Sequence, residues 1–204
     1  MFYKTSEAHG LPHDPFKSCV VPRPIAWVSS IDAEGRVNLA PYSFFNALSS
    51  DPPMVMISFN GYHAHGGDKD TLSNIRACRE FVVNMVPLAQ KDAMNVSTAN
   101  VGHEVDELEL AGLTTETSEL VKPPRVSEAP IHLECELYQE IKLPCTLPNS
   151  ANTMIIGSVL GVHISDGVLT DGLVDTNKIK PLSRLGYMEY TAVDTVFKMA
   201  RPQD

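Results

Sequence analysis

The chain is short of positive charge and of cysteine, and each shortage excludes a class of function. Its 204 residues carry 16 Lys and Arg against 25 Asp and Glu, which gives a formal net charge of −9. No run of Lys or Arg offsets this balance locally, which argues against nucleic acid as a partner. The four cysteines, Cys19, Cys78, Cys135 and Cys145, match neither a CxxC metal site nor a dense disulfide framework.

Long apolar runs and targeting signals are also missing. The longest apolar stretch, near residues 154–164, is too short for a membrane span and is interrupted by glycine and serine. The first ten residues lack a charged segment followed by an apolar one, so no secretory signal is visible. We therefore expect a cytoplasmic protein without membrane contact.

Several strong enzyme motifs are absent as well. The sequence has no GxGxxG, GxxxxGK[ST], GxSxG or HExxH, which removes the usual nucleotide-binding, acyl-transfer and zinc-protease interpretations. Among the histidines only His63 and His65, followed by Asp68, approach ligand spacing, and no third ligand is evident. We expect no metal site.

What is present is an ordinary globular composition, with 43% apolar residues and a mean hydropathy of −0.08. This length and composition predict one domain over residues 1–204, in which residues 1–14 form an N-terminal arm. The strand pattern predicts an antiparallel, mainly β barrel of about seven strands with short helices at its ends. The expected strands are residues 25–31, 37–40, 54–59, 81–86, 131–143 and 154–164.

Details of these elements give further expectations. Residues 54–59 form a continuous apolar run, typical of a strand buried on both faces. Residues 131–143 alternate, which predicts a long strand with one wet side. In residues 154–164 the chain is expected to bend at Gly157 and Gly161.

Helices are predicted from residue 70 to about 79, capped by Asp70 or Thr71, and from Pro87 to about Val96. The acidic segment 102–112 has the pattern of a solvated surface.

The segment 37–45 is the candidate for function. Pro41 cannot donate to a β ladder, so its strand must bulge, bend or lie at a sheet edge, which leaves backbone groups free. Such groups suit the polar edge of a planar heterocycle, and the hydroxyls, lysine and helix start near residues 69–71 suit a phosphate. The alternative interpretation is that these Ser and Thr residues only form turns and caps.

An ordered series of motifs favours the binding-site interpretation over turns and caps alone. The segments PRPIAWVSS, NLAPYSFFNALSSDPPMVMIS, KDTLSNI and EFVVNMV resemble the flavin reductase-like family over roughly residues 15–190. This family has the FMN-binding split-barrel fold and includes nitrilotriacetate monooxygenase component B and flavoredoxin. The resemblance implies a homodimer with FMN beside the subunit interface and NAD(P)H as co-substrate.

Carried over by position, the resemblance implies three groups of cofactor-binding residues. The ring would be edged by Asn38, Leu39, Ala40, Pro41, Tyr42 and Ser43, with Trp27, Ser29 and Ser30 on the neighbouring strand. The phosphate end would be formed by Ser58, Lys69, Asp70 and Thr71. Phe44, Phe45, His163 and Arg184 also match the family pattern, although a core or interface role explains them equally well. No catalytic side chain is assigned, because the reactive atom belongs to the cofactor.

Three functions remain open. The first is an NAD(P)H-dependent flavin reductase that supplies reduced flavin or electrons to a partner such as a monooxygenase. The second is a flavoredoxin-like electron carrier that binds a redox protein through acidic residues Glu104 to Glu109. The third is a binding module that has kept the barrel and lost the cofactor.

Overall fold

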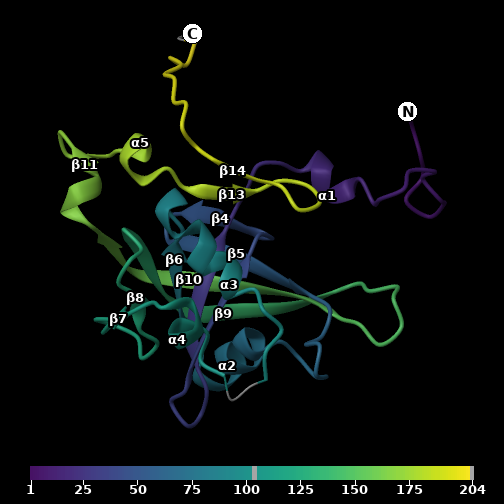
Figure 1. Cartoon of the computed structure of the whole chain (residues 1–204), viewed down its shortest axis with the longest axis horizontal. Helices are drawn as coiled ribbons and strands as arrows, with labels where there is room; N and C mark the ends of the chain where they lie inside the picture. Colours follow the sequence, from purple (N-terminus) through teal and green to yellow (C-terminus); the bar gives the residue numbers. More distant parts are fainter. Residues whose placement is uncertain (103–104, 203–204) are drawn as a thin grey trace.

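A computed structural model of the chain describes residues 1–102 and 105–202. Its main element is one antiparallel sheet of seven strands in the order β3-β2-β6-β9-β10-β5-β4. The first and last strands of this order follow each other in the chain, so the sheet curls into a barrel (Figure 1). The strands are β2 (Ala26–Ile31), β3 (Val37–Tyr42), β4 (Phe45–Ser50), β5 (Pro53–Asn60), β6 (Glu80–Met85), β9 (Ile131–Leu143) and β10 (Asn152–Ile164).

Shorter elements surround the barrel. A small sheet crosses one end of it and pairs β1 (Arg23–Pro24), β13 (Leu182–Arg184) and β14 (Tyr190–Ala192). Two ribbons join β7 (Thr115–Glu116) to β8 (Arg125–Val126) and β11 (Leu169–Thr170) to β12 (Leu173–Val174). The helices are α1 (Phe16–Cys19), α2 (Asp70–Cys78), α3 (Lys91–Val96), α4 (Glu107–Ala111), α5 (Thr176–Ile179) and the 3-10 turns η1 (Leu88–Gln90) and η2 (Asp166–Val168).

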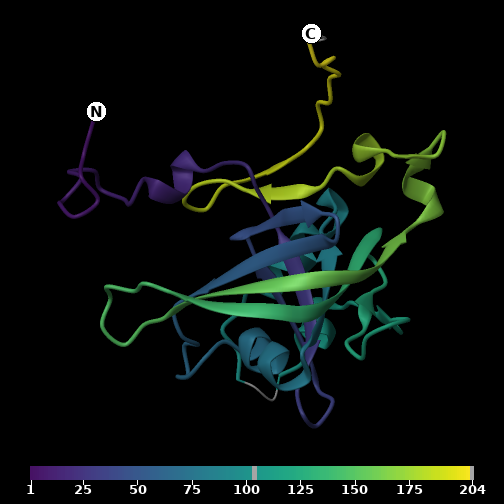
Figure 2. The ribbon, with the colours of Figure 1, turned by 180° about the vertical axis from the view of Figure 1, so that it is seen from behind.

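The two views show how these parts are arranged. In Figure 1 α2 lies at the end of the barrel opposite the β13–β14 sheet, and α3 and α4 lie along its side. From behind, the long β9–β10 hairpin extends well beyond the barrel (Figure 2). None of the helices in the described ranges combines the length and apolar character needed to cross a membrane.

Strand β2 is buried on both faces because it separates two apolar cores. Ala26 and Val28 pack in the barrel interior with Phe81 and other residues. Trp27, on the opposite face, packs with Met94 and other residues in a second cluster beneath the helices. The alternation of side chains along a strand therefore puts this one strand into both cores.

Most predicted elements are confirmed. The hairpin of β2 and β3, the helix from residue 70 and the strand 131–143 are all present. The expected irregularity of residues 154–164 is also present, as register shifts between Ile156 and Gly157 and between Val159 and Gly161. At Gly157 a Cβ atom would lie 2.5 Å from Phe81 Cζ, so this position excludes any side chain.

Two expectations about the strands need correction, and one of the three alternatives given for Pro41 is found. The 54–59 run is not buried on both faces, because Val55, Ile57 and Phe59 are buried while the residues between them are half-buried. Strand β4 was not expected, and the Asp51–Pro53 break is the tight turn that joins it to β5. No bend occurs at Pro41, where β3 keeps its register with β2 from Val37 to Tyr42. The edge position of β3 accommodates the proline instead.

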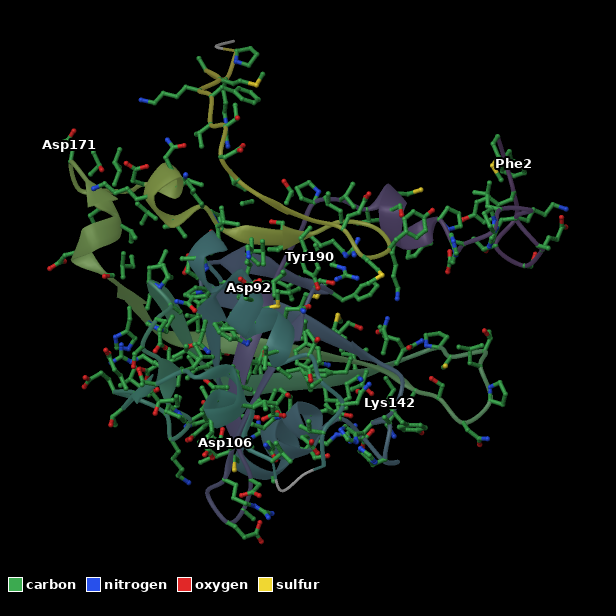
Figure 3. The ribbon with its side chains drawn as sticks, in the orientation of Figure 1. Phe2, Asp92, Asp106, Lys142, Asp171 and Tyr190 are labelled. Carbon is green, nitrogen blue, oxygen red and sulfur yellow. The ribbon has the colours of Figure 1, made fainter. Side chains whose placement is uncertain are left out.

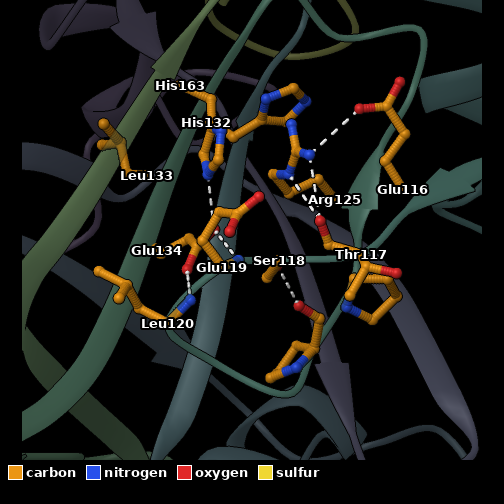
Figure 4. Close-up of polar contacts among 12 residues, drawn as sticks. Glu116, Thr117, Ser118, Glu119, Leu120, Arg125, His132, Leu133, Glu134 and His163 are labelled. Carbon is orange, nitrogen blue, oxygen red and sulfur yellow. Dashed lines mark hydrogen bonds and ion pairs between the residues drawn. The ribbon is translucent and has the colours of Figure 1, made fainter.

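Only part of the β9 face that was expected to be exposed to solvent is exposed. His132 and Glu134 are 5% and 0% exposed, whereas Glu136 and Tyr138, further along the same face, are exposed. The segment between β7 and β8 covers the first part of this face (Figure 4). Glu134 accepts hydrogen bonds from the Glu119 amide (2.8 Å), the Leu120 amide (2.6 Å) and His163 Nε2 (2.6 Å).

These contacts make Glu134 an anchor for the covering segment. Burial by itself would raise the pKa of the Glu134 carboxyl, but the three hydrogen bonds hold that pKa below its usual value. Because the folded pKa is lowered, the ionised carboxylate stabilises the fold above the unfolded pKa. That contribution is lost as the pH falls through the folded value.

We expect Glu134→Gln to lower the free energy of unfolding at pH 7 by about 1 to 3 kcal/mol, because one amide donor loses its acceptor. Urea denaturation of the wild type and the variant measures this difference. The difference should shrink below the ordinary glutamate pKa of about 4.3. Glu136→Gln, on the exposed part of the same strand, is the matched control, and an equal loss in both variants would contradict the anchoring role.

Candidate functional site

Two cavities meet along the edge strand β3 and its exit. The smaller, of about 130 Å³, lies against Asn38, Tyr42 and the start of α2. The larger, of about 460 Å³, lies against Ser43, Phe44 and the β13–β14 sheet. Pro41 and Thr98 line both cavities, so the two together form one extended groove along β3.

Most of the predicted cofactor residues line this groove. The smaller cavity contains Asn38, Ala40, Pro41, Tyr42, Lys69, Asp70 and Thr71. The larger contains Pro41 and Ser43, together with Phe44 and Arg184. Residues far apart in the sequence, from β3 and from the start of α2, are thus brought to one place.

Four predicted residues lie elsewhere, in the core. Trp27, Ser29, Ser30 and Leu39 are 0% exposed and line neither cavity. Trp27 Nε1 donates to Ser97 Oγ (2.9 Å), and Ser30 Oγ accepts from Asn74 Nδ2 (3.1 Å). Ser29 Oγ donates to the Pro124 carbonyl (2.5 Å). In this structure these side chains support the wall of the groove and do not form its surface.

Three further residues are also placed outside the groove. Ser58 Oγ donates to Asn60 Oδ1 (3.1 Å), and the Ser58 amide donates to the Phe44 carbonyl (2.8 Å). Phe45 packs against the barrel core. His163 contacts Glu134 on the covered face of β9.

The outer edge of β3 supplies the backbone groups of the groove. In the β2–β3 ladder Pro41 faces Trp27 and Leu39 faces Ser29, and Pro41 has no N–H to donate. These positions therefore belong to the pairs without ladder hydrogen bonds, whose backbone groups point away from β2. The Leu39 amide confirms this direction, because it donates to Glu107 Oε2 (3.2 Å).

A chain of hydrogen bonds lines the smaller cavity. Tyr42 Oη donates to Thr71 Oγ1 (3.0 Å), and Thr71 Oγ1 donates to Asn38 Oδ1 (2.7 Å). Asn38 Nδ2 in turn donates to Glu107 Oε1 (2.8 Å). Burial raises the pKa of Glu107, and the hydrogen bonds from Leu39 and Asn38 oppose that rise.

Glu107 is a residue that the sequence pattern assigned to the wrong environment. It is 7% exposed although the acidic segment 102–112 was expected on the surface. The part of that segment in the described residues includes helix α4, which Asp106 caps by accepting from the Leu108 amide (2.8 Å). The cap turns Glu107 and Leu108 inward, whereas Glu109 stays exposed. Glu104 lies outside the described residues.

Residues 97–100 are a second addition to the site. Ser97, Thr98, Ala99 and Asn100 follow α3 and line the smaller cavity. The only signal in the sequence was a polar stretch after a predicted helix, which is equally typical of an ordinary loop.

The start of α2 has the chemistry of a phosphate site. Lys69 is the N-cap residue of α2, and its side chain makes no capping hydrogen bond. A helix N-terminus has free N–H donors and partial positive charge, which favour an anion. Within the described ranges no hydrogen bond or ion pair of the Lys69 ammonium is recorded, and the residue is half-buried at the cavity. The donors present therefore fit the phosphate of FMN.

Two carboxylates also line this cavity. Glu107 is engaged by Asn38 and Leu39 at the back of the wall. The Asp70 carboxylate lies 3.8 Å from His63 Nε2, which neutralises it when that imidazole is protonated. Both acids thus have partners of their own.

A wider depression of about 1170 Å³ lies at the base of the β9–β10 hairpin and contains none of the predicted cofactor residues. Arg76 crosses it and forms ion pairs with Asp68 and Glu140. Among the described residues no group of His, Cys, Asp and Glu has the arrangement of a metal site. The β3 groove is therefore the candidate site.

We expect Thr71→Val to destabilise the fold by about 1 to 3 kcal/mol, because it removes the donor to the buried Asn38 amide oxygen. Tyr42→Phe should cost less than Thr71→Val, since Thr71 still donates to Asn38 in that variant. Thermal or urea unfolding of both variants measures the difference. Equal effects would contradict the direction of the hydrogen-bond chain.

Comparison with known proteins identifies the family of the chain and its fold. The model of the flavin reductase like domain matches residues 18–182. An uncharacterised protein of Aquifex aeolicus is 41% identical over 172 residues, which cover 84% of each chain. The crystal structure of nitrilotriacetate monooxygenase component B from Bacillus cereus is similar with a TM-score of 0.88 and 33% identity, covering 98% of both chains.

Two more distant solved structures share the fold. Flavoredoxin of Desulfovibrio vulgaris has a TM-score of 0.77 at 24% identity and covers 98% of this chain and 97% of its own. An FMN-binding protein from Thermus thermophilus has a TM-score of 0.70 at 22% identity, covering 97% of this chain and all of its own. With the domain match over most of the sequence, these findings show that the chain belongs to the flavin reductase-like family, with its split-barrel fold.

Proposed function

We propose that the protein is an NAD(P)H-dependent flavin reductase that binds FMN in the β3 groove. The observation that carries this proposal is the uncapped N-terminus of α2 beside Lys69, at one end of a groove whose other end is lined by Pro41, Ser43 and aromatic side chains. The groove thus has free helix amides and a lysine at one end, for a phosphate, and aromatic side chains at the other, for a ring. Its length and chemistry suit a phosphorylated planar heterocycle.

Different residues of the chain would bind the phosphate and the ring of FMN. Lys69 and the first amides of α2 would hold the phosphate. Thr71, whose hydroxyl donates to Asn38, would support the wall behind them. The backbone groups of Pro41 and Ser43 that point away from β2 would hydrogen-bond the polar edge of the ring, and the buried network behind them would keep that edge rigid. When bound, FMN would accept a hydride from the nicotinamide, release NAD(P)⁺ and deliver two electrons to a partner or leave as reduced flavin. No side chain is assigned to acid or base catalysis.

A homodimer belongs to the same proposal. Val162 and Ile164 are 54% and 40% exposed and pair across the sheet with Leu133 and Ile131. Those two partners line an apolar cavity of about 360 Å³. An exposed apolar face of this kind suits burial against a second copy, and sedimentation velocity would measure the assembly.

The partner that receives the electrons, a monooxygenase or another redox protein, is open. The acidic docking face expected at residues 104–109 is reduced in the structure, because Glu107 is turned into the site. Cytoplasmic localisation stays a prediction from the sequence, which cell fractionation would test.

The purified protein is expected to bind FMN and to lose the visible absorbance of oxidised flavin when mixed rapidly with NADH or NADPH. Bleaching occurs because the hydride reduces the bound ring. No bleaching with either nucleotide, but rapid reduction by a redox protein, would instead identify an electron carrier. A protein that fails to take up added FMN would overturn the cofactor assignment itself.

Lys69→Gln is expected to weaken FMN binding by about 1.5 to 3 kcal/mol, because a charge-assisted contact to phosphate is lost. Titration of FMN fluorescence measures the change, and riboflavin, which lacks the phosphate, should be affected much less. Lys142→Gln is the control, since Lys142 lies at the base of the long hairpin (Figure 3). Equal loss for FMN and riboflavin would contradict a phosphate role for Lys69.

A further inference from the structure

The larger cavity of the groove is cationic although the chain is acidic. Lys17, Arg23 and Arg184 line it together with one acid, Asp14. The chain as a whole has a formal net charge of −9. Three cations against one carboxylate in a concave site focus a positive potential there, which attracts anions from solution.

Arg184 is held in position with donors to spare. Its guanidinium carbon lies 4.3 Å from the centre of the Tyr190 ring, a cation–π contact that holds the side chain beside that ring. Its Nη2 donates to the Tyr187 carbonyl. In residues 1–102 and 105–202 no acceptor is recorded for its Nε or Nη1, and the side chain is half-buried. Arg184 can therefore donate to a ligand without giving up its own contacts. Tyr190 is labelled in Figure 3, on the β13–β14 side of the barrel.

Arg23 builds the wall of the same cavity. It is 7% exposed, and it donates through Nη1 to the Lys17 and Val20 carbonyls and through Nη2 to the Leu185 carbonyl (2.8 Å). Its Nε has no partner among the described residues. Burial and the nearby charge of Arg184 lower the pKa of Arg23, so an anion placed between the two guanidinium groups would relieve an existing repulsion.

The other walls are aromatic and apolar. Phe44 lies with its ring centre 5.8 Å from the Arg23 guanidinium carbon, and Tyr187 and Tyr190 stand on the opposite sheet. Ile25 and Met94 complete the apolar lining. Ring faces and aliphatic side chains contribute no hydrogen bonds to a hydrated phosphate, but they pack well against a flat aromatic molecule.

We propose that this cavity binds a planar aromatic carboxylate, whose carboxylate pairs with Arg184 and Lys17 and whose ring packs between Phe44 and Tyr190. A planar guanidinium matches a carboxylate in a bidentate pair, which suits Arg184. The cavity shares Pro41 with the phosphate-bearing part of the groove. If the proposed function holds, the larger cavity receives both molecules, with the flavin ring against Pro41 and Ser43 and the carboxylate in the part between Phe44 and Tyr190. Binding of the carboxylate itself does not depend on the flavin.

The test uses 2-naphthoate, a fluorescent aromatic carboxylate, and its neutral counterpart 2-naphthamide. Both are titrated into the full-length protein, with and without added FMN, and binding is followed by their fluorescence. We expect naphthoate to bind more tightly than naphthamide and its affinity to fall as salt is raised. Arg184→Gln should weaken naphthoate binding roughly tenfold to a hundredfold and leave naphthamide binding almost unchanged.

Two further variants control the result. Lys17→Gln removes an exposed cation from the short helix α1 and should weaken naphthoate binding in the same direction. Arg36→Gln removes an exposed arginine of the β2–β3 turn, far from the cavity, and should change neither affinity. Equal binding of the two probes, or naphthoate binding that is insensitive to both Arg184→Gln and Lys17→Gln, would overturn the proposal.

Competition separates the other anions. If inorganic phosphate displaces naphthoate at comparable concentration, the cavity is a general anion site and the proposal fails. FMN binding is measured separately by quenching of flavin fluorescence. Naphthoate binding without FMN binding would contradict the proposed function alone, and FMN binding without naphthoate binding would contradict this inference alone.

Discussion

The site depends on one constraint: Pro41 has no N–H to donate, yet its strand β3 must still form a hydrogen-bonded ladder with β2 on one side. An edge position satisfies it, because the proline nitrogen then points away from the ladder to β2. The same alternation turns the Leu39 amide outward, where the buried Glu107 carboxylate accepts it. The contact with Glu107 thus holds the edge of β3 in place. The other backbone groups that point away from β2 lie at the surface of the groove.

The second requirement is that this edge strand be attached to something rigid. Strand β2 provides the attachment, since its two faces belong to two separate cores. Trp27 binds Ser97 from one of these faces, and Ser97 begins the loop that lines the opposite wall of the groove. The hydrogen bond between Trp27 and Ser97 therefore connects both walls of the groove. The residues behind a binding site set its shape as much as those that form its surface.

The fold could be predicted where the signal is local. The alternation of residues 131–143 and the spacing and stop of the helix at 70–78 located both elements within one residue or so. The predicted cap was wrong, because the N-cap is Lys69 and both Asp70 and Thr71 lie inside the helix. Strand β4 was missed because its sequence is polar and its position at an edge leaves most of it exposed. The environments of Glu134 and Glu107 could not be predicted, since each is buried by a segment distant in the sequence. For the site, motifs identified the residues, but only the structure separated those at the groove from those in the core.

The hydrogen bonds of Arg23 to backbone carbonyls have a consequence for the N-terminal arm. The first fourteen residues have no helix or strand, yet Asp14 and Lys17 form part of a cavity wall because Arg23 holds the Lys17 and Val20 carbonyls against the turn at Leu185. A purification tag fused to Met1 would be attached to the segment that forms this cavity wall, whereas a tag fused after the C-terminal tail would not be attached to it. Ligand binding to the cavity should therefore be compared only between preparations that carry the tag at the same terminus.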